Sequence, residues 1–334
     1  MERLIVTGGL GFIGSNFIHH ILDNRSDLTV VNVDYQGPSS NLSNVKDLRQ
    51  NKRYRQLKGN LTDPKIARWI VKNADLVVHF AAETHVDRSI ANPKPFLESN
   101  ILGTYALLEA ARKSKIRRLI HISTDEVYGS AYIGESFVEN SGLDPSSPYS
   151  GTKAASDQLV TAWTRTYKVP AVIMRCTNNY GPYQHPEKLI PKTIIRGLSD
   201  LEIPLYGGGT QIRDWIYVLD FSDAIMKALE KGDVGETFNV STGNELTNKE
   251  IVGRILKLIG KPLSLMKTTE DRPGHDTRYS LSSEKARKVL DWRPTHEFDD
   301  ALRLTVDWYR NHGSWWKPLA TRKTLSKTPW KEKW

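Results

Sequence analysis

The sequence of 334 residues predicts an α/β protein in which a doubly wound parallel sheet is followed by a smaller mixed α/β C-terminal lobe. The first third alternates short, nearly continuous apolar runs with segments of helical length and spacing. Such alternation implies crossovers between parallel strands, which are buried on both faces and therefore lack a polar face. We expect strands at residues 4–8, 29–34, 76–82 and 118–124, and helices at 12–22, 64–72 and 95–113.

The regular alternation of strand and helix patterns ends near residue 180. A predicted helix at 150–167 and a buried strand at 169–175 continue the alternation, but prolines and glycines then interrupt it. Helical patterns return only at 220–230 and 248–259. We therefore expect three parts, with some later chain returning to the first: a sheet domain at 1–180, a smaller lobe at 181–316 and a basic tail at 317–334.

The formal net charge of +9 does not indicate a nucleic-acid-binding protein. Six Lys or Arg residues against one Glu lie in the tail alone, and the remaining excess is spread along the chain. Local positive charge fits an anionic small ligand better. The apolar runs are far shorter than the roughly 20 residues of a membrane-spanning helix, and the single cysteine, Cys176, allows no internal disulfide. We expect a cytoplasmic protein without nucleic-acid or membrane partners.

A glycine motif points to a dinucleotide. The run TGGLGFIGSN places Gly8, Gly11 and Gly14 between the first predicted strand and the first helix. Glycines there let a pyrophosphate approach the backbone, and the helix N-terminus offers free N–H groups carrying about half a positive charge. Asp34 ends the second strand, where a carboxylate accepts hydrogen bonds from the ribose hydroxyls of NAD and repels the extra phosphate of NADP. The motif predicts a Rossmann-type NAD-binding domain. The alternatives are that the glycines form an ordinary strand-to-helix turn and that Asp34 only caps a turn.

Two further motifs carry candidate reacting groups. Tyr149 and Lys153 in YSGTK lie four residues apart at the start of a predicted helix, so their side chains share one face. A cationic Lys153 is expected to lower the pKa of the phenol, which then accepts a hydroxyl proton while hydride leaves the same carbon. By itself this pair is typical of a solvated helix face.

The segment HISTDEVYG adds Thr124, Asp125 and Glu126 at the carboxyl end of a parallel strand, where open α/β sheets assemble their sites.

Two neighbouring acids suit the elimination of water. One carboxylic acid protonates a leaving hydroxyl and the other carboxylate removes a carbon-bound proton, if their surroundings separate their pKa values. The hydrogen on an ordinary sugar carbon is too weakly acidic for a carboxylate, but oxidation of the adjacent hydroxyl to a ketone acidifies it. Oxidation therefore comes first, and the stored hydride reduces the enone, so we expect tightly bound NAD that is regenerated in each turnover. A loop with solvated acids is the alternative interpretation.

These motifs resemble the extended short-chain dehydrogenase/reductase superfamily, and within it the family of dTDP-glucose 4,6-dehydratases. The likeness spans nearly the whole chain. It is carried by GGLGFIGSN, HFAAETHVDRSI, SNILGTYALLEAAR, STDEVYG, SPYSGTKAASD, NNYGPYQHPEKLIP, IRDWIYVLD and DRPGHDTRY. The adjacent Asp125 and Glu126 are the specific part, because related epimerases usually lack this pair.

The resemblance implies a role for each reacting residue. Tyr149 takes the proton of the hydroxyl at carbon 4, Lys153 is its electrostatic partner and a ribose ligand, and Thr124 orients the hydroxyl. Asp125 protonates the leaving hydroxyl at carbon 6, and Glu126 removes the proton at carbon 5. Hydride passes from carbon 4 to NAD and back to carbon 6. The implied product is dTDP-4-keto-6-deoxyglucose, a precursor of rhamnose-type deoxysugars.

The resemblance also implies ligand contacts and a homodimer, but no metal site. The cofactor contacts would be Gly8, Gly11, Phe12, Ile13, Gly14, Asp34, Asn60, Leu61, Phe80, Ala81, Ala82, Ser99, Tyr149, Lys153 and Asn179. The nucleotide-sugar contacts would be Thr84, Thr124, Asn178, Glu187, Lys188, Leu189, Pro204, Tyr206, Arg213, Asn248, Arg272 and His275. The family usually dimerises through paired helices, for which Leu159, Trp163 and Tyr167 are candidates unless they face the domain's own core.

The chain departs from the family pattern mainly at the adenosine end. DYQGPSS at 34–40 replaces a common Asp-Lys-Leu-Thr-Tyr-Ala-Gly run, and Asn60 stands where Asp is usual. The nearest alternative function is that of an epimerase, a decarboxylase or a 4,6-dehydratase for a different nucleotide. A nonenzymatic NAD-binding scaffold is more remote, because it would not need both acids together with Tyr149 and Lys153.

Overall fold

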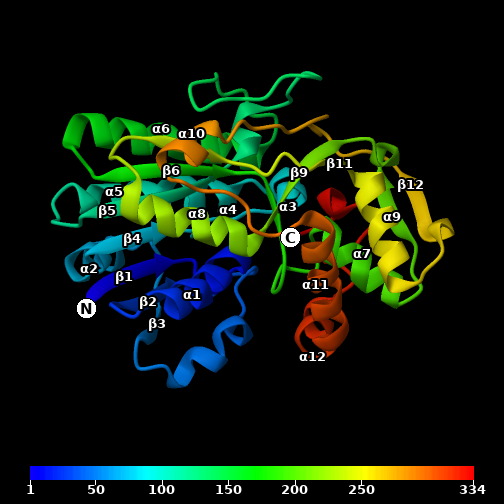
Figure 1. Ribbon diagram of the computed structural model, residues 1–334, viewed down its shortest axis with the longest axis horizontal. Coiled ribbons are helices and arrows are strands. Elements are labelled where there is room, and N and C mark those ends of the chain that lie inside the picture. Colours follow the sequence, from blue (N-terminus) through cyan, green and yellow to red (C-terminus); the bar gives the residue numbers. More distant parts are fainter.

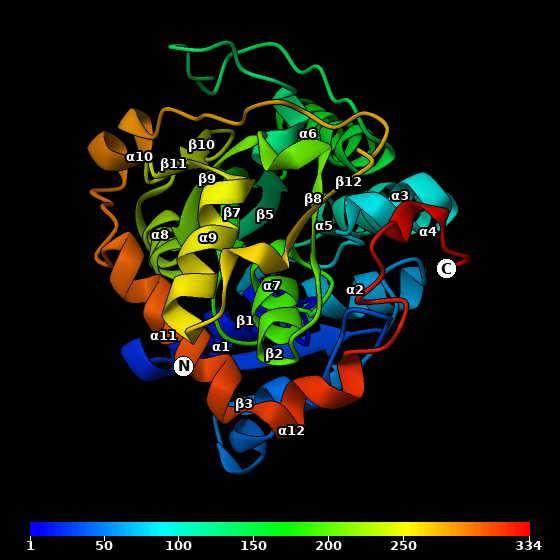
Figure 2. The ribbon, with the colours of Figure 1, turned by 90° about the vertical axis from the view of Figure 1, so that its right-hand side faces the viewer.

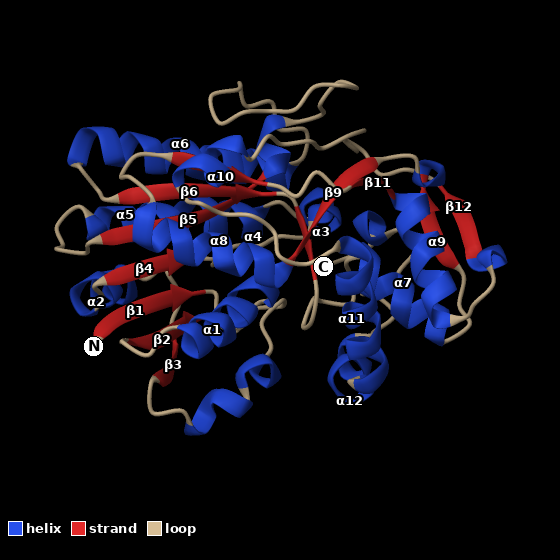
Figure 3. Cartoon of the chain, viewed as in Figure 1, coloured by secondary structure: helices blue, strands red, loops and turns tan.

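The computed structural model describes residues 1–334 and contains a seven-stranded sheet in the order β10-β6-β5-β4-β1-β2-β3. Every neighbouring pair is parallel. The chain starts in the middle of the sheet and builds outward to either side, so the switch in strand order falls between β1 and β4 (Figure 3). The strands are β1 (Glu2–Thr7), β2 (Leu28–Asp34), β3 (Tyr54–Lys58), β4 (Leu76–His79), β5 (Arg118–Thr124), β6 (Ala171–Cys176) and β10 (Thr237–Val240). The predicted fold class is confirmed.

Helices cover both faces of this sheet because its strands are apolar on both faces. In β1, Leu4 and Val6 belong to one buried cluster and Ile5 to the other, as the alternation of side chains along a strand requires. The first cluster is closed by α1 (Phe12–Asn24) and α8 (Val218–Lys231), which pack on each other (Figure 1). The second is closed by α2 (Pro64–Asn73), α5 (Thr104–Ala111) and α6 (Pro148–Tyr167). No helix combines the length and apolar character needed to cross a membrane.

The smaller lobe is built from short strands and three longer helices around its own core. A sheet of β11-β9-β7 and a pair β12-β8 carry the strands (right of Figure 1). β10 and α10 (Glu284–Val289) come later in the chain and pack with the large sheet. The elements of the lobe are β7 (Asn178–Tyr180), α7 (Leu189–Leu198), β8 (Ile203–Tyr206), β9 (Ile212–Tyr217), β11 (Glu245–Thr247), α9 (Asn248–Ile259), β12 (Met266–Thr269) and α11 (Phe298–Asn311).

The structure corrects three expectations about individual elements. Strand β3 was not predicted, because its half-exposed sequence YRQLK at the sheet edge lacks an apolar run. The helix expected at 95–113 is divided into α4 (Lys94–Phe96), a π-helical segment (Leu97–Gly103) and α5. The strand expected to reach residue 82 ends at His79, where its pairing with β1 ends.

The basic C-terminal segment 317–334 is folded onto the protein. Its last helical turn, Pro329–Lys331, packs on α3 (Val86–Ala91), and the chain ends beside α3 and α4 (red in Figure 2). Trp330 is 7% exposed and meets the ring of Tyr206 edge-on, with centroids 4.9 Å apart. The Arg88 guanidinium lies 4.5 Å from the centre of the Trp334 ring. The segment therefore ties α3 to the smaller lobe.

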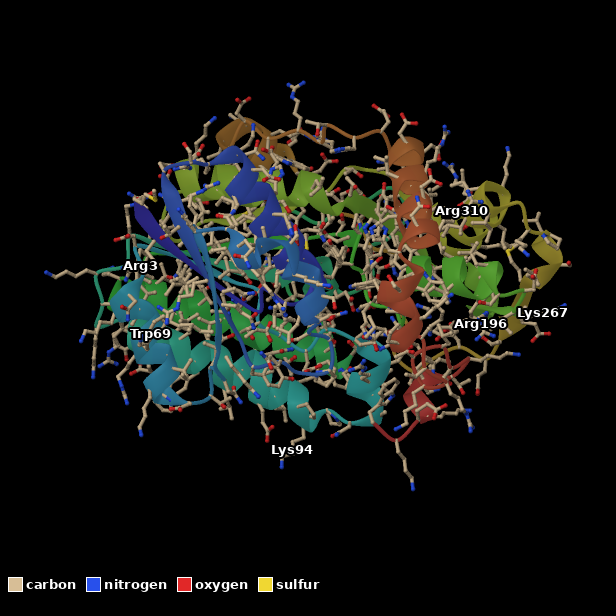
Figure 4. All side chains as sticks on the ribbon, turned by 90° about the horizontal axis from the view of Figure 1, so that it is seen from below. Arg3, Trp69, Lys94, Arg196, Lys267 and Arg310 are labelled. Atoms are coloured by element: carbon tan, nitrogen blue, oxygen red, sulfur yellow. The ribbon has the colours of Figure 1, made fainter.

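We predict that Trp330→Ala lowers the free energy of unfolding by about 3 kcal/mol, because it removes a large buried side chain and leaves a cavity. Urea denaturation followed by circular dichroism measures the change. Trp69→Ala on α2 is the matched control, because Trp69 is 36% exposed at the surface seen in Figure 4. Equal losses for the two variants would contradict a structural role for the C-terminal segment.

Candidate active site

One cavity of about 650 Å³ runs along the carboxyl ends of the central strands. It joins the glycine turn after β1 to the start of α6, so the predicted dinucleotide end and the predicted reacting end share one space. Of the residues singled out in the sequence, the following line it: Gly8, Gly11, Phe12, Ile13, Gly14, Asp34, Asn60, Leu61, Phe80, Ala81, Ala82, Thr84, Ser99, Thr124, Asp125, Glu126, Tyr149, Lys153, Asn178, Asn179, Glu187 and Lys188.

The glycine turn fits a dinucleotide pyrophosphate. Gly8 has φ +74°, and a Cβ added there would lie 2.6 Å from the backbone nitrogen of Ala81. A Cβ on Gly14 would lie 2.6 Å from the carbonyl oxygen of Gly8, so the first turn of α1 can pack against the end of β1 only without side chains. Gly11 is the N-cap of α1 and supplies no side-chain cap, and the first turn has no acidic residue. The backbone amide groups in the first turn of α1 are therefore available to bind an anion.

Asp34 is fixed beside the glycine turn, at the end of β2. Its Oδ2 accepts from the Leu10 amide at 3.1 Å, and its Oδ1 accepts from the Gln36 amide and the Ser40 hydroxyl, both at 2.7 Å. A carboxylate has about four lone-pair sites, so these bonds hold the group while leaving room for hydroxyl donors. Tyr35, Ser39 and Ser40 also line the cavity, at the segment where the sequence departs from the family pattern.

The reacting residues come from the end of β5 and the start of α6. Thr124 ends β5 and caps a short 3₁₀ turn, Asp125–Tyr128. Ser147 caps α6 through a reciprocal capping box, and Pro148 occupies its first turn, so Tyr149 and Lys153 occupy its first two turns. Lys153 Nζ donates to the Ile122 carbonyl oxygen at 2.7 Å, which directs its ammonium group to the end of β5.

The two adjacent acids differ in their electrostatic surroundings. Burial, followed by the charge of Glu126, raises the pKa of Asp125 well above its usual value. Burial also raises the pKa of Glu126, but the charges of Arg272, Lys188 and Arg213 oppose the shift. Thr124 Oγ1 donates to Oδ1 of Asp125 at 3.0 Å, while Oδ2 has no protein partner. The pair is therefore arranged so that Asp125 holds a proton more firmly than Glu126.

The expected lowering of the Tyr149 pKa is not what the protein alone produces. Burial, followed by the negative charge of Glu126, raises the pKa of Tyr149 well above 10, although the Thr124 hydroxyl acts in the opposite direction. Burial lowers the pKa of Lys153 to about 8, and the charge of Asp157 opposes that shift. A phenol this deeply buried beside carboxylates needs additional positive charge close by before it can act as a base.

Seven residues expected to bind the nucleotide sugar are not among those that line the cavity. They are Leu189, Pro204, Tyr206, Arg213, Asn248, Arg272 and His275. Arg272 donates to Asp87 Oδ1 at 2.8 Å, so part of its charge is already balanced within the protein. Arg213 donates to the carbonyl oxygen of Asp276 at 2.8 Å, and its guanidinium lies 4.0 Å from the centre of the Tyr279 ring.

The sequence did not single out every residue near the acids. The Tyr279 hydroxyl lies 3.4 Å from Glu126 Oε2 and donates to Asp276 Oδ2 at 2.8 Å. Tyr279 is the last residue of the DRPGHDTRY motif, and its place in this motif was the only sequence signal that it belongs to the site. Cys176, Thr177 and Gln184 also line the cavity. Gln184 lies within the quoted motif NNYGPYQHPEKLIP, but nothing in the local sequence marks Thr177 or Cys176 as residues of a site.

The fold and this constellation define a dinucleotide-dependent enzyme of the extended short-chain dehydrogenase/reductase class. The family model described as GDP-mannose 4,6 dehydratase matches residues 5–305. A dTDP-glucose 4,6-dehydratase of Mycobacterium tuberculosis strain H37Rv is 43% identical, with 95% of this chain and 96% of the relative covered. The corresponding protein of Escherichia coli K12 is 42% identical, with 94% of each covered.

Solved structures agree with these sequences. DesIV, a dTDP-glucose 4,6-dehydratase of Streptomyces venezuelae solved with NAD and TYD bound, superposes with a TM-score of 0.93 at 42% identity, covering 95% of this chain and 99% of that one. A UDP-glucuronic acid 4-epimerase of Bacillus cereus gives 0.88 at 29% identity, covering 92% and 99%. The chain belongs to the dTDP-glucose 4,6-dehydratase family. The expectations of an NAD-dependent enzyme and of a lyase are confirmed.

We predict that Gly14→Ala weakens NAD binding by about tenfold or more, because the added Cβ would force the glycine turn away from the helix N-terminus. Equilibrium dialysis with labelled NAD measures the affinity. Gly253→Ala on α9 is the matched control, because its Cβ would meet only a Leu263 methyl group at 3.9 Å. An unchanged affinity in Gly14→Ala would remove the glycine turn from the NAD site.

Proposed function

We propose that this protein converts dTDP-glucose to dTDP-4-keto-6-deoxyglucose in the synthesis of rhamnose-type deoxysugars. The observation that carries the proposal is the pair Asp125 and Glu126 in the same cavity as Tyr149, Lys153 and the glycine turn. An epimerase or a decarboxylase on this fold would have no use for two buried acids at this position. The choice of thymidine over another base rests on the family.

Tyr149 acts first, as the acceptor of the proton from the hydroxyl at carbon 4. Bound NAD supplies a positively charged nicotinamide ring, which takes the hydride from carbon 4 and later returns it to carbon 6. That charge, together with the ammonium group of Lys153, offsets the burial that raises the pKa of the phenol. Thr124 orients the hydroxyl beside Tyr149 and keeps Asp125 in place through its hydrogen bond.

Glu126 and Asp125 then divide the elimination between them. The cations near Glu126 favour its carboxylate, which removes the proton at carbon 5 once carbon 4 is a ketone. The raised pKa of Asp125 favours the protonated form of its carboxyl group, and this proton goes to the hydroxyl that leaves carbon 6. Water is the only net product besides the keto sugar, so the enzyme needs no added oxidant.

The nucleotide diphosphate is assigned to the side of the cavity facing the smaller lobe. Lys188 lines the cavity, and its Nζ donates to the Thr84 carbonyl oxygen at 2.8 Å. Arg213 and Arg272 lie close enough to Glu126 for their charges to lower its pKa. A phosphate bound to these arginines would therefore lie close to the two acids. The buried pair of Arg88 and Glu187 closes this end.

We predict that the purified protein turns dTDP-glucose into the 4-keto-6-deoxy product without added NAD and moves hydrogen from carbon 4 to carbon 6. Glu126→Gln should slow product formation and solvent exchange at carbon 5 by about 100-fold or more, because it removes the base, while NAD stays bound. Mass spectrometry of the product made in D₂O measures both.

Glu135→Gln, on the exposed segment that follows the same turn, is the control and should behave as the wild type. An epimerised sugar as the product would overturn the proposed reaction. A Glu126→Gln variant that dehydrates at the wild-type rate would leave the reaction standing and remove Glu126 from its role.

We also propose a homodimer formed through α5, α6 and the π-helical segment. Leu97, Leu102, Tyr105 and Tyr167 are exposed on these elements by 43–52%. Trp163 packs partly on the core and meets Tyr105 edge-on, with centroids 5.8 Å apart. Exposed aromatic and aliphatic groups gathered on neighbouring helices are typical of an interface.

Tyr105→Glu is expected to convert the dimer to a monomer, because it places a charge among these apolar groups. Light scattering should then give 37.9 kDa in place of about twice that mass. Leu304→Glu on α11 is the control, because Leu304 is 54% exposed on a different surface. A wild-type protein that scatters as a monomer at micromolar concentration would contradict the dimer.

The cytoplasm is the compartment that we propose for this reaction. The single cysteine, Cys176, is buried and free. Burial raises the pKa of its thiol, which keeps it protonated and unreactive. The fold therefore depends on no disulfide, which suits a reducing compartment.

A further inference from the structure

Tyr35 and Glu83 are joined across the carboxyl end of β1. Tyr35 directly follows β2, and Glu83 lies four residues beyond the end of β4, with β1 between these two strands. The Tyr35 hydroxyl donates to Glu83 Oε1 at 2.7 Å. β1 leads directly into the glycine turn at Gly8. The hydrogen bond therefore spans the carboxyl end of the sheet at the position of the glycine turn.

The backbone around Tyr35 is shaped to hold the phenol in this position. Gln36 has φ +65°, a left-handed conformation that turns the chain sharply, and its amide donates to Asp34 Oδ1. A Cβ on Gly37 would lie 1.9 Å from the Tyr35 hydroxyl oxygen, so only glycine leaves room for the ring. Burial and the charge of Glu83 raise the pKa of Tyr35, so the phenol keeps its proton and is the donor.

Glu83 is the fixed side of this contact. Its amide donates to Asn100 Oδ1 at 2.8 Å, and Asn100 Nδ2 donates back to the Glu83 carbonyl oxygen at 3.0 Å. Asn100 belongs to the π-helical segment and also donates to Thr152 Oγ1 on α6. Glu83 is 6% exposed, whereas Tyr35 is 41% exposed on a loop. The contact therefore joins a half-exposed phenol on a loop to an anchored carboxyl group.

The cavity is continuous past this contact. Tyr35 lines it together with Asp34, Asn60, Tyr149 and Lys153, whereas Glu83 holds the Tyr35 hydroxyl from outside this lining. We propose that the hydrogen bond between Tyr35 and Glu83 is a clasp over the cofactor cleft that slows the release of bound NAD. A cofactor that is reduced and reoxidised within one turnover has no need to leave, so the clasp does not slow the reaction. The inference rests on the NAD site described above.

The rate at which bound NAD leaves tests the clasp without reference to activity. The protein is loaded with radiolabelled NAD, freed of unbound label and mixed with an excess of unlabelled NAD, and the label that remains on the protein is followed by rapid gel filtration. Tyr35→Phe and Glu83→Leu should each release NAD about five- to tenfold faster, the change expected for one lost hydrogen bond. Gly37→Ala should have the same effect, because it displaces the phenol without removing it.

The double variant Tyr35→Phe with Glu83→Leu should release NAD no faster than either single variant, because the two residues form one contact. Tyr132→Phe is the matched control: Tyr132 is 79% exposed outside the cavity lining, and the release rate of this variant should equal that of the wild type. Release from Tyr35→Phe within twofold of the wild-type rate would overturn the clasp, as would multiplied effects in the double variant. A wild-type protein that retains no label would overturn the NAD site as well.

Discussion

A buried row of three side chains joins the central strands near their carboxyl ends. Thr7 on β1 is in register with His79 on β4, which is in register with His121 on β5. Thr7 Oγ1 lies 2.7 Å from His79 Nδ1, and the other ring nitrogen of His79 lies 3.0 Å from Thr104 Oγ1 on α5. Burial lowers the pKa of both imidazoles, so the row is uncharged at neutral pH. The segments that follow the three strands therefore reach one cavity.

The burial that stabilises the sheet also sets the chemistry of the site. Asp125 and Glu126 carry raised pKa values because water is excluded around them, and they differ because cations from the smaller lobe act mainly on Glu126. Lys153 loses its proton more readily for the same reason. Asp157, one turn further along α6, opposes that loss and is held by Arg175 at 2.8 Å. The pKa values of Asp125, Glu126 and Lys153 thus depend on charged residues from both the sheet domain and the smaller lobe.

Local patterns predicted the elements whose signals are contained in short segments. The start of α1, the helix at 248–259 and the end of β5 at Thr124 lie where the sequence placed them. Strand β3 was not predicted because an edge strand needs no apolar run. The helix at 95–113 was predicted to be continuous because the chain stays helical through the π-helical segment, which differs from an α-helix only in its hydrogen-bond spacing. The links of Tyr279 to Glu126 and of Tyr35 to Glu83 join residues far apart in the chain, so no local pattern could reveal them.

The sequence by itself determined the types of reacting group and the strand ends that carry them. Glycines at a strand-to-helix turn, two acids after β5, and a Tyr and a Lys one helical turn apart are local features, and local sterics and hydrogen bonding decide them. Only the tertiary structure decided which acid keeps its proton, how Arg272 is balanced by Asp87, and that the basic C-terminal segment packs on α3. These depend on distances and on the exclusion of water between distant segments, which arise only when the two lobes pack together.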